Sequence, residues 1–145
     1  MTIIPTRNFT LKEKGVIINN LNLRKGHGLA LKGLIPKYAN GFAINLGKDA
    51  SNFILHFNAR FNLHGDTNTI VCNSKESNYW GAEQRERAFP FKQGEETSLF
   101  FIYREDKVIV KLPDGTEFSF PVRMHLDTIS FLSLDGLVMN SLSMA

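Results

Sequence analysis

Three side chains that form directional hydrogen bonds alternate along the stretch His56-Phe57-Asn58-Ala59-Arg60. Successive side chains of a β-strand point to opposite faces, so His56, Asn58 and Arg60 share one face and Phe57 and Ala59 the other. An ordinary solvated face carries Lys, Glu, Thr or Ser. Imidazole, amide and guanidinium together both donate and accept hydrogen bonds. The pattern therefore predicts a strand that buries one face and offers the other to a polar, uncharged ligand.

More polar groups follow this strand. The turn-prone connection after it places His64 and Asp66 near the end of the strand. In the next apolar run, Asn73 falls on the side of Thr69 and Val71, opposite the residues that face the core. We expect Asn73 to join the polar face and Asp66 to stabilise the turn or to orient an arginine.

The only tryptophan, Trp80, stands among Asn, Tyr and Gly residues, whereas a core aromatic usually has alternating apolar neighbours. We therefore expect an exposed indole, which can cover the C–H patch on one face of a galactose ring. Glu83 and Arg85 follow and share a face if this segment is extended. We expect Glu83 to accept hydrogen bonds from sugar hydroxyls and to hold Arg60 by a charge-assisted bond.

Short extended runs separated by turns recur along the chain at the spacing of an all-β sandwich. The candidate strands are 16–23, 29–34, 41–46, 52–61, 68–73, 98–104, 107–112, 116–120, 128–134 and 137–144. Pro113-Asp114-Gly115 predicts a hairpin over 107–120. No segment keeps a 3.6-residue spacing of apolar residues long enough for a good helix, and we expect at most a single helical turn, over 121–127. Residues 1–14 are interpreted as an N-terminal extension and 15–145 as one domain.

Composition narrows the function classes. The 145 residues, 43% of them hydrophobic and 12 of them Phe, suffice for one domain with an aromatic core. A net charge of +3 with no basic run does not favour nucleic-acid binding. We see no membrane-spanning run and no secretory signal pattern. The single cysteine, Cys72, forms no intrachain disulfide, and we expect it to be buried in a protein that folds in a reducing compartment.

Taken in order, these motifs resemble those of the galectins, and the resemblance covers roughly residues 15–145. The matching strings are His56-Phe57-Asn58-Ala59-Arg60, Asn45-Leu46-Gly47-Lys48-Asp49, Asn68-Thr69-Ile70-Val71-Cys72-Asn73, Trp80-Gly81-Ala82-Glu83-Gln84-Arg85 and Phe89-Pro90-Phe91. The resemblance implies a jelly-roll β-sandwich of two antiparallel sheets. It also implies a lectin for β-galactosides such as lactose and N-acetyllactosamine, with no catalytic activity, no cofactor and no metal.

The resemblance also implies roles for single residues. His56, Asn58 and Arg60 would hold the 4-hydroxyl of galactose, and Trp80 would stack on the ring. Ala59 stands where the family usually has proline, but it belongs to the core side, so we expect no lost sugar contact.

For the rest of the disaccharide, the resemblance gives Asn73 and Glu83 the 6-hydroxyl side of galactose. Arg60, Glu83 and Arg85 would reach the neighbouring glucose or N-acetylglucosamine, and His64 would lie at the edge of the groove.

At the level of the molecule, the resemblance implies glycans of glycoproteins and glycolipids as partners, crosslinked by a noncovalent homodimer, without membrane insertion. In the family the terminal strands form the dimer interface. Here residues 1–14 have no counterpart in short members, and the final segment is unusually polar at Asn140, Ser141 and Ser143. The resemblance further implies residence in the cytoplasm and export from the cell without a signal peptide.

Other functions are weighed against this interpretation. A glycoside hydrolase needs two carboxyl groups, one of them with a raised pKa, and Glu83 and Asp66 are the only plausible pair. Arg60 and Arg85 beside Glu83 would favour its charged form, the opposite of what a general acid needs. A metal site on His56 and His64 lacks a third ligand of proper spacing. The main alternative is a galectin-related structural protein that does not use sugar binding.

Overall fold

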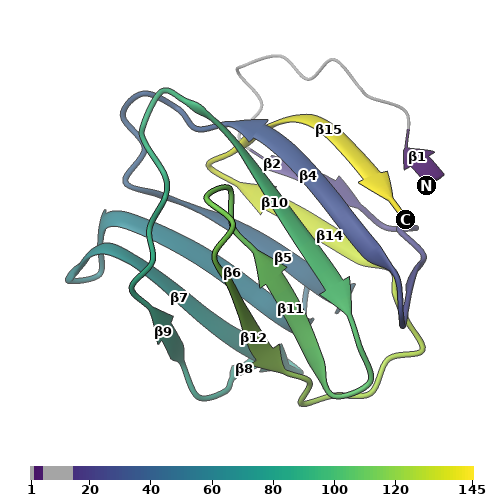
Figure 1. The fold of residues 1–145 in the computed structure, drawn as a ribbon. Coiled ribbons are helices and arrows are strands. Elements are labelled where there is room, and N and C mark those ends of the chain that lie inside the picture. Colours follow the sequence, from purple (N-terminus) through teal and green to yellow (C-terminus); the bar gives the residue numbers. More distant parts are fainter. Residues whose placement is uncertain (1, 5–14) are drawn as a thin grey trace.

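Two antiparallel sheets face each other across one core in the computed structural model, which describes residues 2–4 and 15–145 (Figure 1). One sheet has six strands in the order β1-β15-β4-β10-β11-β12, and the other has seven in the order β2-β14-β5-β6-β7-β8, with β9 also paired to β7. A two-stranded ribbon, β13-β3, completes the pairing. The strands are β1 (Thr2–Ile4), β2 (Gly15–Ile18), β3 (Leu23–Arg24), β4 (Gly28–Leu34), β5 (Gly41–Asp49), β6 (Asn52–Leu63), β7 (Asp66–Glu76), β8 (Tyr79–Trp80), β9 (Gln84–Glu86), β10 (Glu96–Tyr103), β11 (Lys107–Lys111), β12 (Glu117–Pro121), β13 (Thr128–Ile129), β14 (Phe131–Asp135) and β15 (Val138–Met144). Among the described residues there is no helix long and apolar enough to cross a membrane.

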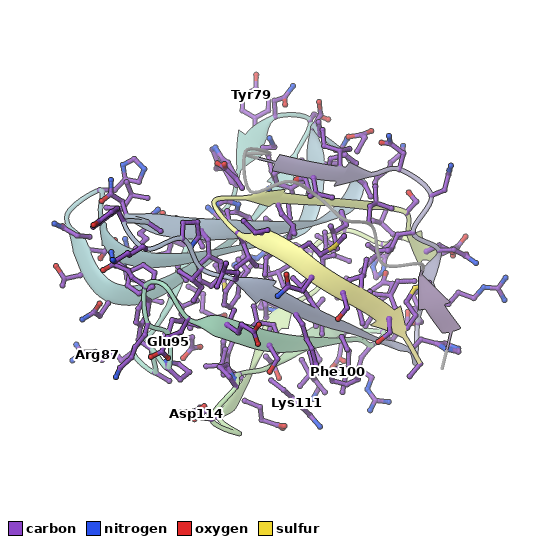
Figure 2. The ribbon with its side chains drawn as sticks, turned by 90° about the horizontal axis from the view of Figure 1, so that it is seen from above. Tyr79, Arg87, Glu95, Phe100, Lys111 and Asp114 are labelled. Atoms are coloured by element: carbon purple, nitrogen blue, oxygen red, sulfur yellow. The ribbon has the colours of Figure 1, made fainter. Side chains whose placement is uncertain are left out.

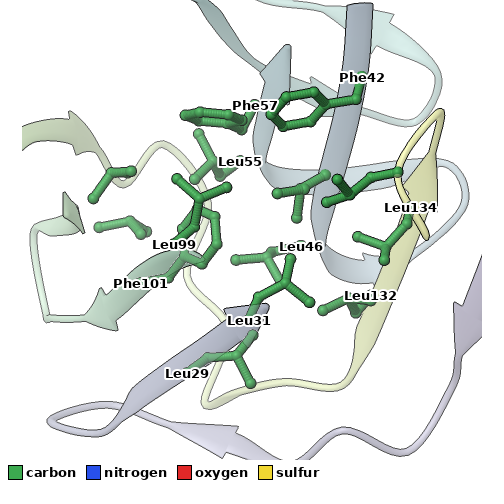
Figure 3. Packing of buried hydrophobic residues seen from close by; sticks show 14 of the residues in the cluster. Leu29, Leu31, Phe42, Leu46, Leu55, Phe57, Leu99, Phe101, Leu132 and Leu134 are labelled. Atoms are coloured by element: carbon green, nitrogen blue, oxygen red, sulfur yellow. The ribbon is translucent and has the colours of Figure 1, made fainter. Parts of the chain in front are cut away.

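The core lies between the sheets and is rich in aromatic rings, as the composition predicts. Phe57 is completely buried, and its ring lies 6.3 Å from that of Phe42 and 6.1 Å from that of Phe101, on the opposite sheet. Figure 3 places Phe57 beside Phe42, with leucines from both sheets filling the rest of the interior. Ala59 is also completely buried, so the prediction that it faces the core is confirmed.

Most predicted strands are present, and the differences have local causes. The predicted strand over 16–23 divides into β2 and β3, and between them Asn22 has a φ of 59°, a left-handed conformation that interrupts a strand. The run 128–134 likewise divides into β13 and β14. The hairpin of β11 and β12 is confirmed, with Gly115 at a φ of 89° in its turn. The predicted helical turn over 121–127 is wrong, because Pro121 ends β12 and 122–127 are irregular.

The extension predicted over 1–14 is described only at Thr2–Ile4. These residues form β1, which pairs antiparallel with Leu142–Met144 of β15. The rest of the predicted extension lies outside the described residues. Its division from the domain at residue 15 stays a prediction.

The strands β6 and β7 form the hairpin that carries most of the predicted site. His64 and Gly65 have φ values of 51° and 82° between the paired residues Leu63 and Asp66, as a two-residue type I′ turn requires. This turn fixes the register, so His56 lies opposite Asn73 across the strand pair.

Candidate functional site

A groove of about 520 Å³ lies on the face of the seven-stranded sheet that is turned away from the core. Its lining consists of Ala43, His56, Asn58, Arg60, Leu63, His64, Val71, Asn73, Trp80, Gly81, Glu83 and Asp135. Seven of the eight residues predicted from the sequence are therefore brought together here. The eighth, Arg85, pairs with Glu83 and lies beside the groove.

His56 is held in one tautomer by a chain of hydrogen bonds along the sheet. The side-chain amide of Asn45 donates from Nδ2 to the Ser133 hydroxyl at 3.0 Å, so its Oδ1 faces the ring. The Nδ1 atom of His56 lies 2.5 Å from that oxygen and must carry the proton, which leaves Nε2 as a hydrogen-bond acceptor. Burial, together with the positive charges of Arg60 and Lys75, lowers the pKa of His56 to about 4.

Asn45 and Ser133 were not predicted from the sequence, although the sequence carries a signal for Asn45. Ile44 and Leu46 are completely buried, so the period-two alternation of β5 turns Asn45 to the groove face. The register sets Asn45 opposite both His56 and Ser133. Which strand would lie beside β5 could not be read from the sequence.

Arg60 is 8% exposed, and two of its three guanidinium nitrogens donate to neighbouring side chains. Its Nε donates to Asn58 Oδ1 and its Nη1 to Asp66 Oδ2, each at 2.7 Å. Asn58 in turn donates from Nδ2 to the Phe42 carbonyl at 3.0 Å. These bonds hold the guanidinium in one orientation, with its other N–H groups available as donors.

The partner predicted for Arg60 was wrong. We expected Glu83 to hold it, but the carboxylate that does so is Asp66, which follows β6 after the tight turn and reaches back to that strand. Asp66 also accepts from Arg85 at 3.1 Å, and the two arginines lower the pKa of its carboxyl group. Glu83 pairs with Arg85 at 2.9 Å, as expected for neighbours on one face. Asp66 therefore orients an arginine, one of the two roles predicted for it.

Trp80 stands at the rim of the groove, and 53% of its surface is exposed. Its ring centre lies 4.8 Å from that of His56, and the ammonium group of Lys75 lies 5.1 Å from the indole. Its neighbour Tyr79 points away from the body of the molecule (Figure 2). The exposed fraction of Trp80 confirms the prediction of an exposed indole. The indole is open to solvent because β8 is a two-residue strand at the end of the sheet.

Asn73 is 5% exposed and lines the groove from β7. Its Nδ2 donates to the Gly81 carbonyl at 3.0 Å, and its Oδ1 accepts from the backbone N–H of Ser74 at 2.8 Å. The Gly81 N–H returns a bond to the Ser74 carbonyl at 2.9 Å. The end of β7 and the segment after Trp80 are thus joined through the Asn73 side chain.

The groove is not arranged for the alternative chemistries. Asp66 has a lowered pKa, the opposite of what a general acid needs. Cys72 is completely buried on the core face, where burial raises the pKa of its thiol, so the prediction of a buried cysteine is confirmed. The described part of the chain contains no cluster of three or more His, Cys, Asp or Glu side chains that could bind a metal ion.

Comparison with known proteins agrees with this geometry. Residues 14–144 match the family model described as galactoside-binding lectin. Galectin-1 of Rhinella arenarum is 58% identical over 129 residues, which are 89% of this chain and 96% of the relative.

Solved structures are similarly close. A complex of toad ovary galectin with thio-digalactose superposes with a TM-score of 0.90 and 56% identity, over 92% of this chain and 99% of the other. A homodimeric agglutinin from chicken liver gives a TM-score of 0.86 and 39% identity over 90% and 99%. These similarities confirm the predicted jelly-roll sandwich of two antiparallel sheets.

Proposed function

The chain belongs to the galactoside-binding lectin family, and we propose that its groove binds β-galactosides such as lactose and N-acetyllactosamine without catalysing a reaction. The observation that supports this most directly is the row of His56, Asn58 and Arg60 on the groove face of β6, beside the exposed indole of Trp80.

The row matches the hydrogen-bonding capacity of a single axial hydroxyl. A hydroxyl group donates once and accepts twice. His56 Nε2 is a free acceptor, and Asn58 and Arg60 each keep an unused N–H donor. The 4-hydroxyl of galactose could therefore satisfy all three, and the indole of Trp80 would cover the C–H face of the same ring. The equatorial 4-hydroxyl of glucose would leave this buried row unpaired.

The remaining groove residues fit the rest of a disaccharide. We assign the 6-hydroxyl of galactose to the free N–H of Asn73 and to Glu83, and the second sugar to Arg60, Glu83 and Arg85. His64 lies exposed at the end of the groove, where a longer glycan would pass. One open site of this kind predicts a dissociation constant of roughly 1 mM to 1 μM.

Calorimetric titration with lactose and with cellobiose tests the proposal, because the two disaccharides differ only in the configuration of the terminal 4-hydroxyl. We expect binding of lactose alone, and retention on immobilised lactose with elution by lactose but not by sucrose. Equal binding of both sugars would contradict the role of the row. No binding of either sugar would favour the alternative, a structural protein that retains the fold without using sugar.

We further propose that the chain crosslinks glycans of glycoproteins and glycolipids as a noncovalent homodimer. Two sites on one assembly raise weak single-site affinity by avidity. The similar agglutinin from chicken liver is homodimeric by its description. In this chain the edge strand β2 carries Ile17, 66% exposed, which suits contact with a second copy.

Residence in the cytoplasm, with export that needs no signal peptide, is part of the same proposal. The single buried thiol of Cys72 supports folding in a reducing compartment. Immunodetection in cell lysate and in medium, beside a cytosolic marker enzyme, tests it. Protein confined to one of the two fractions would contradict it.

A further inference from the structure

Arg123 lies outside the groove lining, in the irregular segment between β12 and β13, yet its guanidinium reaches β7 behind the site. Its Nη1 donates to Ser74 Oγ at 3.0 Å and to Asn73 Oδ1 at 3.4 Å. The guanidinium lies 4.6 Å from the centre of the Phe120 ring, which supports it from the other side.

These contacts account for the orientation of the Asn73 amide. Its oxygen faces two donors, the Ser74 N–H and Arg123 Nη1, and one of its two N–H groups is used by the Gly81 carbonyl. One N–H is left for a ligand. A flipped amide would set its NH₂ group against both donors, so Arg123 favours the orientation that offers a donor to the groove.

Arg123 also lies directly behind the segment that carries the indole. A Cβ atom added to Gly81 would lie 2.8 Å from Ser74 Oγ and 2.9 Å from Arg123 Nη1. The backbone next to Trp80 therefore packs closely on the guanidinium, and a side chain at position 81 would displace the Ser74 hydroxyl and the Arg123 guanidinium.

We propose that Arg123 is a positioning residue that fixes the Asn73 amide and thereby determines recognition of the galactose 6-hydroxyl. This inference rests on the proposed function, because it assigns the free N–H of Asn73 to that hydroxyl. Arg123 itself touches no sugar. Its effect should be confined to ligands that carry the 6-hydroxyl.

The test compares lactose with 6′-deoxylactose, which lacks only that hydroxyl. Arg123→Ala should lower the affinity for lactose by roughly 2- to 10-fold, the usual effect of one hydrogen bond, and leave the affinity for 6′-deoxylactose unchanged. Arg123→Lys should recover part of the loss, because an ammonium group still donates. Arg104→Ala, which removes an exposed arginine elsewhere, should affect neither sugar and serves as the charge-matched control.

Thermal unfolding and the fluorescence of the single tryptophan show whether each variant keeps the native fold. Should Arg123→Ala fail to fold, Arg123→Gln permits the same comparison. A loss of equal size for both sugars would overturn the inference, since it would indicate general disruption of the groove. Unchanged affinity for lactose would overturn it as well. In both cases the wild-type chain still binds lactose, whereas failure of the proposed function would show as no binding by the wild-type chain.

Discussion

The buried imidazole of His56 must be neutral to accept a hydrogen bond from a sugar. Its pKa of about 4 keeps it neutral far into the acidic range. We therefore expect lactose affinity to be constant from about pH 8 to about pH 5 and to fall as pH approaches 4. A histidine with an ordinary pKa would instead lose affinity in mildly acidic solution. Calorimetric titrations over this range check it, and a transition centred near the ordinary histidine pKa would contradict the burial argument.

The indole of Trp80 is a separate contribution, because it is exposed and adds little to the core. Trp80→Ala should weaken lactose binding by about 1–3 kcal/mol, the range for stacking on an aromatic ring. The midpoint of thermal unfolding should change little, since 53% of the side chain is already exposed. Tyr79→Ala, on the neighbouring exposed residue that points elsewhere, is the matched control. Normal lactose affinity in Trp80→Ala would refute the stacking role.

Residue types and spacing were enough to predict which side chains line the groove, because alternation along one strand decides its faces. They did not identify the partners of those side chains. Asp66 rather than Glu83 holds Arg60, and Asn45, Ser133 and Arg123 were not predicted at all. Such contacts depend on which strands lie side by side and on how a loop folds back, and these are relations between distant parts of the sequence.

The hairpin of β6 and β7 is the element on which the site depends. Its tight turn sets Asp66 between Arg60 on β6 and Arg85 on β9, so one carboxylate fixes two guanidinium groups. Asp66→Asn removes the charge and leaves Arg60 with a weaker acceptor. We expect lactose affinity to fall roughly tenfold or more, as for loss of charge-assisted bonds.

Asp106→Asn, at an exposed position between β10 and β11, provides the comparison for Asp66→Asn, and its affinity should match the wild type. Calorimetry with lactose at neutral pH is the measurement. An affinity within twofold of wild type in Asp66→Asn would mean that Arg60 is held without this carboxylate.

Elements were predictable where turn residues marked their ends, as in the hairpin around Gly115. They were not predictable where tertiary contacts decide. β8 and β9 have two and three residues, too few for a periodic pattern, and exist because they pair with the edge of β7. The segment 121–127 contains no helix. Pro121 is the last residue of β12, and Arg123 donates a hydrogen bond to Ser74 of β7.

At the scale of the molecule, binding and stability occupy opposite faces of the same sheet. Phe57 and Ala59 are completely buried, while His56 and Arg60 on the same strand line the groove. The sandwich also has two kinds of edge. β15 already has a neighbour on its outer side, β1, whereas β2 has none among the described residues. Of these two strands, β2 is therefore the one that is open to a second copy.

Ile17 on β2 tests the proposed homodimer. It lies three strands from His56, about 14 Å away at the usual strand spacing, so its replacement should not reach the sugar. We expect the wild-type chain to sediment as a dimer and Ile17→Lys as a monomer. The monomer should bind lactose with unchanged affinity per site but no longer agglutinate glycan-bearing vesicles. Tyr38→Lys, at a loop residue that is 84% exposed, controls for the change from an apolar to a charged side chain and should remain dimeric. A wild-type monomer at high concentration would contradict the proposed homodimer. A dimer that survives Ile17→Lys would show that the homodimer does not depend on Ile17 at the β2 edge.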